Sequence, residues 1–212
     1  MFDSVLIIYI VLFTAYFIIH SLTASLWFKN WCFSLWPNLK LTYRLWFNIL
    51  SSILLVPLII LLVIYPGEML WQWTGWQAVF VNILAISAAI GFYFSLSDYN
   101  MTEFWGINIF SGQINKNLPK EQFYIGRFHL YVRHPWYFFL LIILWTRDMT
   151  TYQFLTAVLI SLYLIIGSYL EEQKMISYFG EIYRIYQQKV AGLIPLPWKF
   201  LTREEADRLL EK

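Results

Sequence analysis

Long apolar runs separated by short polar stretches dominate the pattern of this chain. A helix needs about 20 mostly apolar residues to cross about 30 Å of hydrocarbon. Five apolar segments can be compared with that length, at residues 4–27, 41–65, 76–96, 135–146 and 152–170. The fourth is short, and at about 1.5 Å per residue it cannot cross a standard bilayer alone. The pattern therefore predicts an all-α integral membrane protein with about five transmembrane helices.

The fourth and fifth segments are predicted to form a helical hairpin. Arg147, Asp148 and the neighbouring threonines make a short polar connection between them. The two ends of a hairpin return to the same side, whether the hairpin crosses the bilayer fully or re-enters. We therefore expect Arg133-His134, before the fourth segment, and Glu171-Glu172, after the fifth, to lie at one membrane face.

The pattern changes after Leu170. Apolar residues then recur at helical spacing from Met175 to Val190, with charged and amide side chains between them, which predicts an amphipathic helix resting on the membrane or on the bundle. Gly180 is expected to kink this helix, and Pro195 and Pro197 to end regular structure.

Thr202-Arg203-Glu204-Glu205 predicts a capping box that opens a short soluble helix. The chain then divides into four parts of one membrane domain. These are a three-helix part at 1–97, a cytoplasmic loop at 98–134, a hairpin with the amphipathic helix at 135–200, and a soluble tail at 201–212.

Composition supports the membrane class and narrows the partners. The chain is 59% hydrophobic and only 13% charged, and its net charge of +2 gives no reason to expect nucleic acid. Membrane lipids are the expected surroundings. The single cysteine, Cys32, cannot form an internal disulfide and is interpreted as a packing residue. The first apolar run has Asp3 before it rather than a basic stretch, so we interpret it as a retained helix and not a signal peptide.

The basic residues predict the orientation. They gather in alternate connections and after the fifth segment: Lys29, Lys40 and Arg44; Lys116, Lys120, Arg127 and Arg133; Lys174, Arg184, Lys189, Lys199, Arg203 and Arg208. Cytoplasmic connections carry the excess of lysine and arginine, so we expect the N-terminus outside and the C-terminus in the cytoplasm.

One dense polar constellation stands out against this apolar background. It consists of Arg133-His134-Pro135-Trp136-Tyr137 and Glu171-Glu172. Charges at the rim of a membrane segment are costly unless they are paired, hydrated or bound to a ligand. We therefore predict a site for a polar cofactor at the cytoplasmic face. The three histidines lack metal-ligand spacing, so no metal is predicted.

The same residues resemble a known family. The run Arg133-His134-Pro135-x-Tyr137, the pair Glu171-Glu172, and then Phe179-Gly180, Tyr183, Tyr186, Val190 and Pro195 resemble the C-terminal signature of the isoprenylcysteine carboxyl methyltransferase superfamily. That superfamily also takes in membrane phospholipid methyltransferases, membrane thiol methyltransferases that act on methanethiol, and NnrU-type proteins.

The N-terminal half is similar to the NnrU and thiol methyltransferase branch. The similar runs are His20-Ser21-Leu22-x-Ala24-Ser25, Tyr43-Arg44-Leu45-x-x-Asn48 and Phe104-Trp105-Gly106. This branch implies a bacterial inner membrane, although an endoplasmic reticulum location would give the same topology. Two positions depart from the family: Phe139 replaces a residue that is often small, and His129 replaces a tyrosine. Both departures bear on the substrate more than on the cofactor.

The resemblance implies S-adenosylmethionine as methyl donor, and the residue types suit that ligand. Arg133, His134 and the Tyr137 phenol offer donors to its carboxylate. Glu171 or Glu172 offers acceptors to its ammonium, adenine and ribose groups. The aromatic faces of Tyr137 or Tyr183 suit its sulfonium. Pro135 fits the first turn of a helix, whose free N–H groups favour a carboxylate.

The implied reaction moves a methyl group to a lipophilic or small membrane-permeant acceptor, which is a thiol, a carboxylate or a lipid. A neutral thiol or amine needs a proton acceptor, for which His129 and Glu171 are the candidates. Arg133 is a candidate for orienting an anionic acceptor. A structural interpretation stays open beside this one: Arg133-His134 as interfacial anchors, one of the two glutamates on a solvated face, and Tyr183 as a packing residue.

Two rival functions remain open on the sequence. Membrane sterol reductases also carry an Arg-His-Pro-x-Tyr segment, but they use NADPH and have many more helices than this chain provides. A non-catalytic, NnrU-like accessory protein is the second rival. The bound cofactor separates the three: S-adenosylhomocysteine, NADPH or neither.

Overall fold

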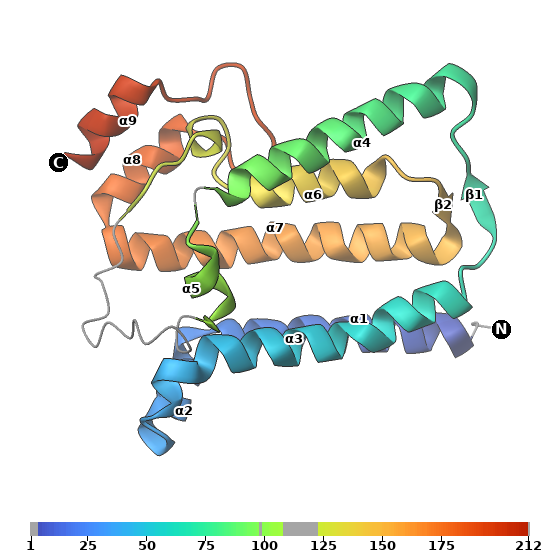
Figure 1. Cartoon of the computed structure of the whole chain (residues 1–212), viewed down its shortest axis with the longest axis horizontal. Helices are drawn as coiled ribbons and strands as arrows, with labels where there is room; N and C mark the ends of the chain where they lie inside the picture. The colour runs from blue at the N-terminus through green and yellow to red at the C-terminus, as the bar shows by residue number, and fades with distance from the viewer. Residues whose placement is uncertain (1–3, 98, 108–122, 212) are drawn as a thin grey trace. The chain divides into compact units, whose positions relative to one another are not determined.

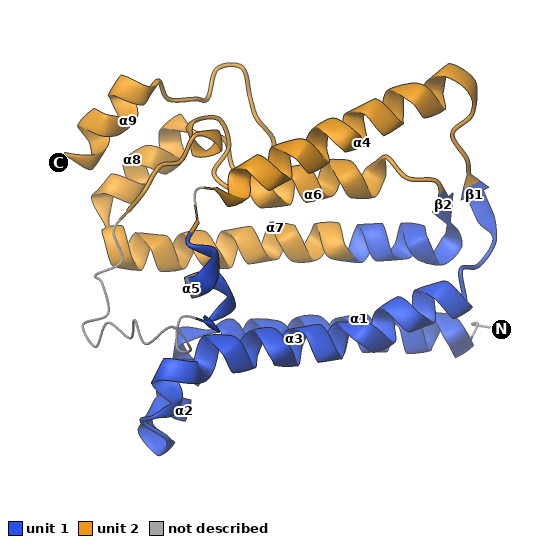
Figure 2. Ribbon diagram, in the orientation of Figure 1, with its two compact units in different colours: residues 1–70, 100–117, 149–159 blue, residues 71–99, 118–148, 160–212 orange. Residues whose placement is uncertain are grey.

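The computed structural model describes residues 4–97, 99–107 and 123–211, and the chain divides into two compact units (Figures 1 and 2). Unit 1 comprises residues 1–70, 100–117 and 149–159, and unit 2 comprises residues 71–99, 118–148 and 160–212. Lys116 and Lys120, which contribute to the predicted orientation, lie outside the described residues.

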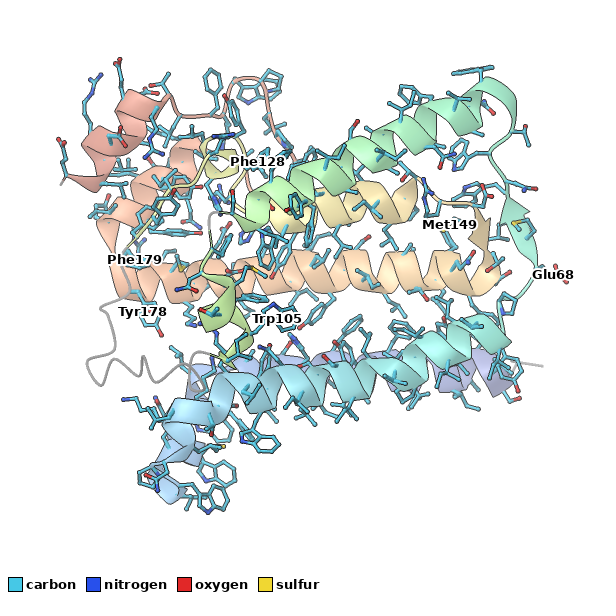
Figure 3. All side chains as sticks on the ribbon, in the orientation of Figure 1. Glu68, Trp105, Phe128, Met149, Tyr178 and Phe179 are labelled. Atoms are coloured by element: carbon cyan, nitrogen blue, oxygen red, sulfur yellow. The ribbon has the colours of Figure 1, made fainter. Side chains whose placement is uncertain are left out.

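Four long apolar helices and one short one confirm the predicted all-α membrane class within the described residues. They are α1 (Ser4–Ala24), α3 (Leu39–Ile64), α4 (Gly75–Leu96), α7 (Thr151–Phe179) and the short α6 (Pro135–Trp145). Their outer faces carry large exposed apolar side chains, such as Val63 and Trp76 at 74% and 76% exposure. Figure 3 shows side chains projecting along the whole length of these helices.

Unit 1 contains most of the N-terminal half. Its elements are α1, α2 (Leu26–Leu35), α3, α5 (Met101–Trp105), the first turns of α7, and a two-stranded sheet made by β1 (Met69–Trp71, mostly in this unit) and β2 (Met149–Thr150). The predicted segment 4–27 was wrong at its end. The chain breaks at Ser25, whose hydroxyl accepts from the Phe28 N–H at 3.2 Å and starts the separate helix α2.

The core of unit 1 forms where α7 begins. The Tyr9 and Tyr152 rings stack with their centroids 5.0 Å apart, and Phe13 and Leu58 complete the buried cluster. The Tyr9 hydroxyl is hydrogen-bonded to Thr156 Oγ1 at 3.0 Å, which satisfies both buried hydroxyl groups.

Two of the N-terminal motifs meet in unit 1. Asn48 of α3 donates from Nδ2 to the Phe104 carbonyl of α5 at 3.0 Å. Gly106 lies so close to α3 that a Cβ on it would be 2.6 Å from the Leu45 backbone nitrogen. The two runs therefore share one structural task, which is to fix α5 on α3.

Unit 2 contains α4, α6, the rest of α7, α8 (Glu181–Lys189) and α9 (Arg203–Leu210), with a 3₁₀ turn at Phe128–Leu130. Helices α6 and α7 form the predicted hairpin. At one end the Trp145 indole donates to Ser161 Oγ at 3.0 Å, and at the other the Tyr137 hydroxyl donates to Glu171 at 3.3 Å.

Helix α6 packs most closely on α4, a contact that the sequence pattern did not predict. Phe139 of α6 is buried against Gly91 of α4, where a Cβ would lie 2.5 Å from the Phe139 ring. The large Phe139 side chain, which departs from the pattern of the family that the sequence resembles, therefore fits because the facing helix carries no side chain at that point.

The predicted end of the fifth segment at Leu170 was wrong, whereas the expected interruption at Gly180 is confirmed. Helix α7 continues without a break to Phe179, and the chain turns at Gly180 with φ +57°, a conformation that glycine adopts at little cost. The expected amphipathic helix is thus the end of α7 plus a separate α8. Because Glu171 and Glu172 lie inside α7, the helix itself fixes their directions.

The apolar face of α8 packs into a small core of its own. Tyr183, Tyr186 and Val190 are buried there with residues from the 125–130 segment and from α9. The predicted capping box is confirmed: Thr202 and Glu205 exchange side chain to backbone hydrogen bonds at the start of α9. Helix α9 thereby covers α8, with Ala206 and Leu209 in the core.

We expect Gly91→Ala to destabilise the protein, because its Cβ would overlap the Phe139 ring. Overpacking of this kind costs about 1–3 kcal/mol. The matched control is Gly167→Ala on α7, where nothing lies within 4 Å of the new Cβ. There, alanine should stabilise the helix by up to about 1 kcal/mol.

The unfolding temperature of both variants is measured in detergent. The readout is the reaction of a fluorogenic maleimide with Cys32, which is buried in the folded protein. Adding Phe139→Leu to Gly91→Ala should recover part of the loss. Equal effects of the two glycine substitutions would contradict this account of the α4–α6 contact.

Candidate functional site

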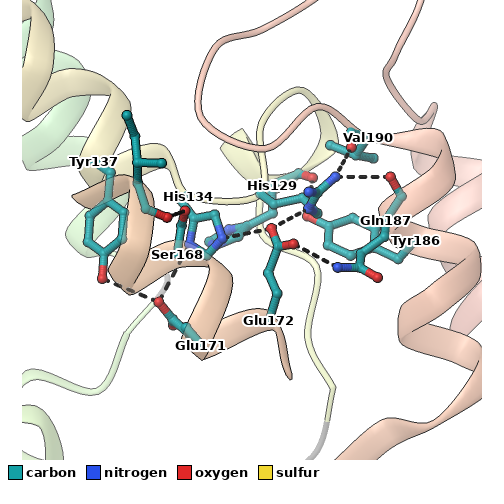
Figure 4. A network of polar contacts seen from close by, with 11 residues as sticks. His129, His134, Tyr137, Ser168, Glu171, Glu172, Tyr186, Gln187 and Val190 are labelled. Atoms are coloured by element: carbon teal, nitrogen blue, oxygen red, sulfur yellow. Dashed lines mark hydrogen bonds and ion pairs between the residues drawn. The ribbon is translucent and has the colours of Figure 1, made fainter. Parts of the chain in front are cut away.

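Three elements of unit 2 supply the site: the first turn of α6, the pair Glu171-Glu172 on α7, and the C-terminal end of α8 (Figure 4). Pro135 occupies the first turn of α6, as predicted, where its missing N–H is not needed. The segment just before it is fixed to the chain beyond α8, because Arg133 N–H and His134 N–H donate to the carbonyls of Ala191 and Gly192.

Glu172 is the centre of the polar network. One carboxylate oxygen accepts from Arg133 Nε at 2.7 Å and is 3.0 Å from His134 Nε2. The other oxygen accepts from Gln187 Nε2 at 2.7 Å. The Glu172 side chain is only 11% exposed, so protein groups rather than water stabilise its charge.

Arg133 clamps the start of α6 to the end of α8. Besides Glu172, its guanidinium donates to the carbonyls of Gln187, at 2.9 Å, and Val190. These carbonyls lie at the C-terminal end of α8, where helical carbonyls lack intrahelical partners and favour a positive charge. The fork of donors in arginine suits this double role, which lysine could not fill.

His134 lies between the two carboxylates. Its Nε2 is 3.0 Å from Glu172, its Nδ1 is 3.5 Å from Glu171, and its ring stacks on Tyr137 at 5.3 Å between centroids. Burial alone would lower the pKa of His134, but the hydrogen bonds and charges of Glu171 and Glu172 outweigh it and raise the pKa above the ordinary value of 6.5. With an acceptor at each nitrogen, the imidazolium is the favoured form.

The structure separates the roles of the adjacent glutamates, which periodicity alone could not do. Glu172 faces inward, whereas the Glu171 side chain is 50% exposed. Glu171 accepts from the Tyr137 hydroxyl and faces His134 Nδ1. Within the described site, Glu171 thus combines accessible acceptor oxygens with an ordered orientation.

Tyr183 lies in the core beside this network. It is 3% exposed and contacts the Phe123 and Tyr186 rings, which agrees with the packing interpretation. Burial and the charge of Glu172 raise the pKa of Tyr183 far above its ordinary value, so its phenol stays neutral. The Tyr186 hydroxyl donates to the His129 carbonyl at 2.7 Å and thereby fixes the 3₁₀ turn.

His129 is held by this turn next to two aromatic side chains, one from the segment that follows α4 and one from α6. Its Nε2 lies 3.2 Å from the Tyr99 hydroxyl, and the Tyr99 ring in turn contacts the Trp136 ring at 4.8 Å between centroids. This places the candidate proton acceptor in unit 2, on the segment that leads into the first turn of α6.

Sequence reasoning missed Gln187, Tyr99 and the carbonyls at the end of α8. In one continuous helix, Gln187 would lie about four turns beyond Glu172. The break at Gly180 instead turns the chain back and brings the Gln187 amide to the Glu172 carboxylate. In the sequence, only the side-chain type of Gln187 indicated this role, because an amide supplies a neutral donor to a buried carboxylate.

The described residues contain no group of three or more histidine, cysteine, aspartate or glutamate side chains that would hold a metal ion. The described site offers an ordered carboxylate, an imidazole and aromatic faces at the N-terminus of a helix. Such a set suits a polar ligand that carries a positive charge.

We expect Glu172→Ala to destabilise the protein strongly, because it leaves the charges of Arg133 and His134 without their shared carboxylate. Removing one partner of a buried ion pair costs about 3–5 kcal/mol. Glu171→Ala is the matched control on the adjacent position, and loss of its hydrogen bond should cost about 1 kcal/mol. Comparable unfolding temperatures for the two variants would contradict the central role of Glu172.

We expect stability to fall as the pH rises through the raised pKa of His134. The charged ring is favoured in the folded state, so its contribution is complete below the unfolded pKa of about 6.5 and is lost above the folded pKa. Unfolding temperatures measured across this window should decline more steeply for the natural protein than for His134→Asn. Parallel pH profiles would show that His134 does not carry this charge.

Comparison with known proteins adds an independent finding. The chain is 35% identical over 126 residues to a methanethiol S-methyltransferase of a Pseudomonas species, a match that covers 58% of this chain and 43% of that protein. It is 29% identical to methanethiol S-methyltransferase 1 of Bradyrhizobium diazoefficiens, covering 89% of this chain and 66% of the relative.

A methanethiol S-methyltransferase of Pseudomonas deceptionensis is 28% identical over 90% of this chain and 72% of its own length. The matches to the Bradyrhizobium and Pseudomonas deceptionensis proteins cover 89% and 90% of this chain. The part of the chain that they leave out is shorter than α7, which has 29 residues, so both matches extend into the helices of the site. The chain spans 43% and 66% of the first two relatives. No family model and no solved structure matches the chain. Together, the similarities support a family of membrane methyltransferases.

Proposed function

We propose that this protein is an S-adenosylmethionine-dependent membrane methyltransferase of the isoprenylcysteine carboxyl methyltransferase superfamily, and that its acceptor is a small thiol. One observation carries the proposal: Glu171, an accessible and oriented carboxylate, lies with Tyr137 at the N-terminus of α6, supported by the closed network around Glu172. The names of the relatives support methyl transfer and a thiol acceptor.

The residues suit the methyl donor in charge and in chemical type. When bound, S-adenosylmethionine supplies a methyl group on a positively charged sulfonium. The Glu171 carboxylate is available to the ammonium of the ligand, and the ring of Tyr137 offers an aromatic face to a cation. The N–H groups of the first turn of α6 favour a carboxylate at the same end of the site.

Arg133 has a different part in this proposal from the one expected on the sequence. Its guanidinium is engaged by Glu172 and two carbonyls, so it acts through the network and orients His134 and Glu172 rather than holding a ligand or an acceptor. Arg133, His134 and Glu172 together fix the first turn of α6, and this fixed turn presents Tyr137 and Glu171 to the ligand.

His129 is the proposed proton acceptor for a neutral thiol. Arginine stays protonated and Glu172 is enclosed by three donors, which leaves His129 and Glu171 as the groups that can take a proton. With Glu171 assigned to the positively charged ligand, His129 takes this role, and the Tyr99 hydroxyl fixes the direction of its Nε2.

The bilayer suits such an acceptor. Small thiols and lipophilic molecules dissolve in hydrocarbon and reach a site between membrane helices without crossing water. The distribution of the basic residues supports a site at the cytoplasmic face, where the cell makes S-adenosylmethionine. The proposed membrane is a bacterial inner membrane.

Calorimetric binding of S-adenosylhomocysteine to detergent-purified protein tests the cofactor. We expect the natural protein to bind it and Glu171→Gln to bind about 10- to 100-fold more weakly, since a hydrogen bond to a charged group is worth about 1.5–3 kcal/mol. Glu204→Gln on α9, where the side chain is 86% exposed, is the matched control and should bind normally. NADPH should not bind.

Methyl transfer from S-adenosylmethionine to methanethiol tests the acceptor and His129. We expect His129→Gln to lower kcat without changing the affinity for S-adenosylhomocysteine, and the deficit should shrink as the pH rises and the thiol ionises. Binding of NADPH instead of S-adenosylhomocysteine, or of neither, would reject the proposed function. Normal turnover in His129→Gln would reject only the role of His129.

A further inference from the structure

The connection between α8 and α9 carries an apolar surface that faces outward. Ile194, Trp198 and Phe200 are 65%, 74% and 48% exposed, and Tyr131, at 52%, stacks on Phe200 with centroids 6.3 Å apart. We call these four residues the aromatic tip. Large apolar side chains gathered in this way on a segment outside the membrane helices are typical of an interaction surface.

Both ends of the connection are fixed to the segment that leads into α6. At its start, Val132 and Ala191 form a parallel bridge, and His134 N–H donates to the Gly192 carbonyl. At its end, Leu201 N–H donates to the Leu130 carbonyl at 2.9 Å, and the Leu201 side chain is 1% exposed. The connection therefore cannot move independently of residues 130–134.

Between these anchors, the connection forms a stiff turn. Leu196 and Lys199 are bridged, with Lys199 N–H donating to the Leu196 carbonyl at 3.0 Å, so that Trp198 stands near the apex. Pro195 and Pro197 restrict the backbone on the approach to the apex. The exposed side chains are thus presented in a preset arrangement, with little ordering cost on contact.

The position of the anchors identifies the surface that covers the aromatic tip. Residues 130–134 lie immediately before Pro135, where the apolar helix α6 begins, so the connection lies beside the start of an apolar helix. The apolar sequence of α6 predicts that its start lies at the membrane surface. Tryptophan and tyrosine favour this level because their rings are apolar and their polar atoms prefer hydrated headgroups.

The charge of the connection agrees with this position. Lys199 is the single charged residue between Val190 and Thr202 in the sequence, and no acidic residue lies there. A cation beside exposed aromatic rings suits anionic headgroups. Helix α8 does not supply this contact, because its apolar face is already covered by α9 and the 125–130 segment.

We propose that the aromatic tip is inserted into the headgroup region of the bilayer and anchors the small α8–α9 core to the membrane surface. The same insertion fixes residues 130–134 relative to the bilayer, and with them the backbone of Arg133 and His134. This inference concerns the bilayer only and stands whether or not the proposed methyl transfer takes place.

Depth-dependent fluorescence quenching in lipid nanodiscs tests the insertion in the full chain. In a Cys32→Ala background, which removes the one natural cysteine, Trp198→Cys is labelled with an environment-sensitive dye. The matched control is Arg208→Cys on α9, where the arginine side chain is 72% exposed. Nanodiscs contain phosphatidylcholine and phosphatidylglycerol, with a nitroxide either near the headgroup or deep in the acyl chain.

We expect the dye at position 198 to emit at shorter wavelength than the dye at position 208, and to lose fluorescence to the shallow nitroxide more than to the deep one. Aqueous iodide should quench the dye at position 208 and largely spare the dye at position 198. Because Trp198 is 74% exposed, its replacement should not disturb folding. Efficient iodide quenching at position 198 would overturn the proposal. Shielding from both quenchers, with cross-linking between chains, would also overturn it and assign the aromatic tip to a second copy.

Discussion

The site depends on one buried carboxylate. Glu172 accepts from Arg133, His134 and Gln187, which belong to the start of α6 and to α8, while Glu172 itself comes from α7. A buried charge without partners is costly, so these three segments are stable only when they meet. The clamp formed by Arg133 on the last carbonyls of α8 strengthens the same arrangement.

The adjacent position on the helix has the opposite character. Consecutive residues of a helix point about 100° apart, so the inward direction of Glu172 leaves Glu171 half exposed. The structure thereby sets a fully satisfied carboxylate beside an accessible one, and His134 touches both. In the proposed enzyme, Glu172 stabilises the packing of the three segments and Glu171 binds the ligand. The Tyr137 ring, which stacks on His134, and the His129 side chain complete the site.

Residues 130–134 link the start of α6 to the small α8–α9 core and, through the aromatic tip, to the proposed membrane contact. Residues 130–134 lead into α6, accept and donate backbone hydrogen bonds with the connection that bears the aromatic tip, and contain Arg133 and His134. Phe139, one turn further along α6, fixes the helix against Gly91 of α4. Contacts with α4 and with the α8–α9 core therefore fix the start of α6 from two directions.

The sequence by itself determined the features that depend on local physics. Apolar run lengths gave the membrane class and the short α6, Pro135 marked a first turn, and Thr202 with Glu205 marked a capping box. Tertiary structure alone decided which glutamate faces inward, that Gln187 returns to Glu172, and that Gly91 accommodates Phe139. Those outcomes depend on contacts between distant segments and on the break at Gly180, which a periodic pattern does not encode, because helical spacing fixes a face without naming its partner.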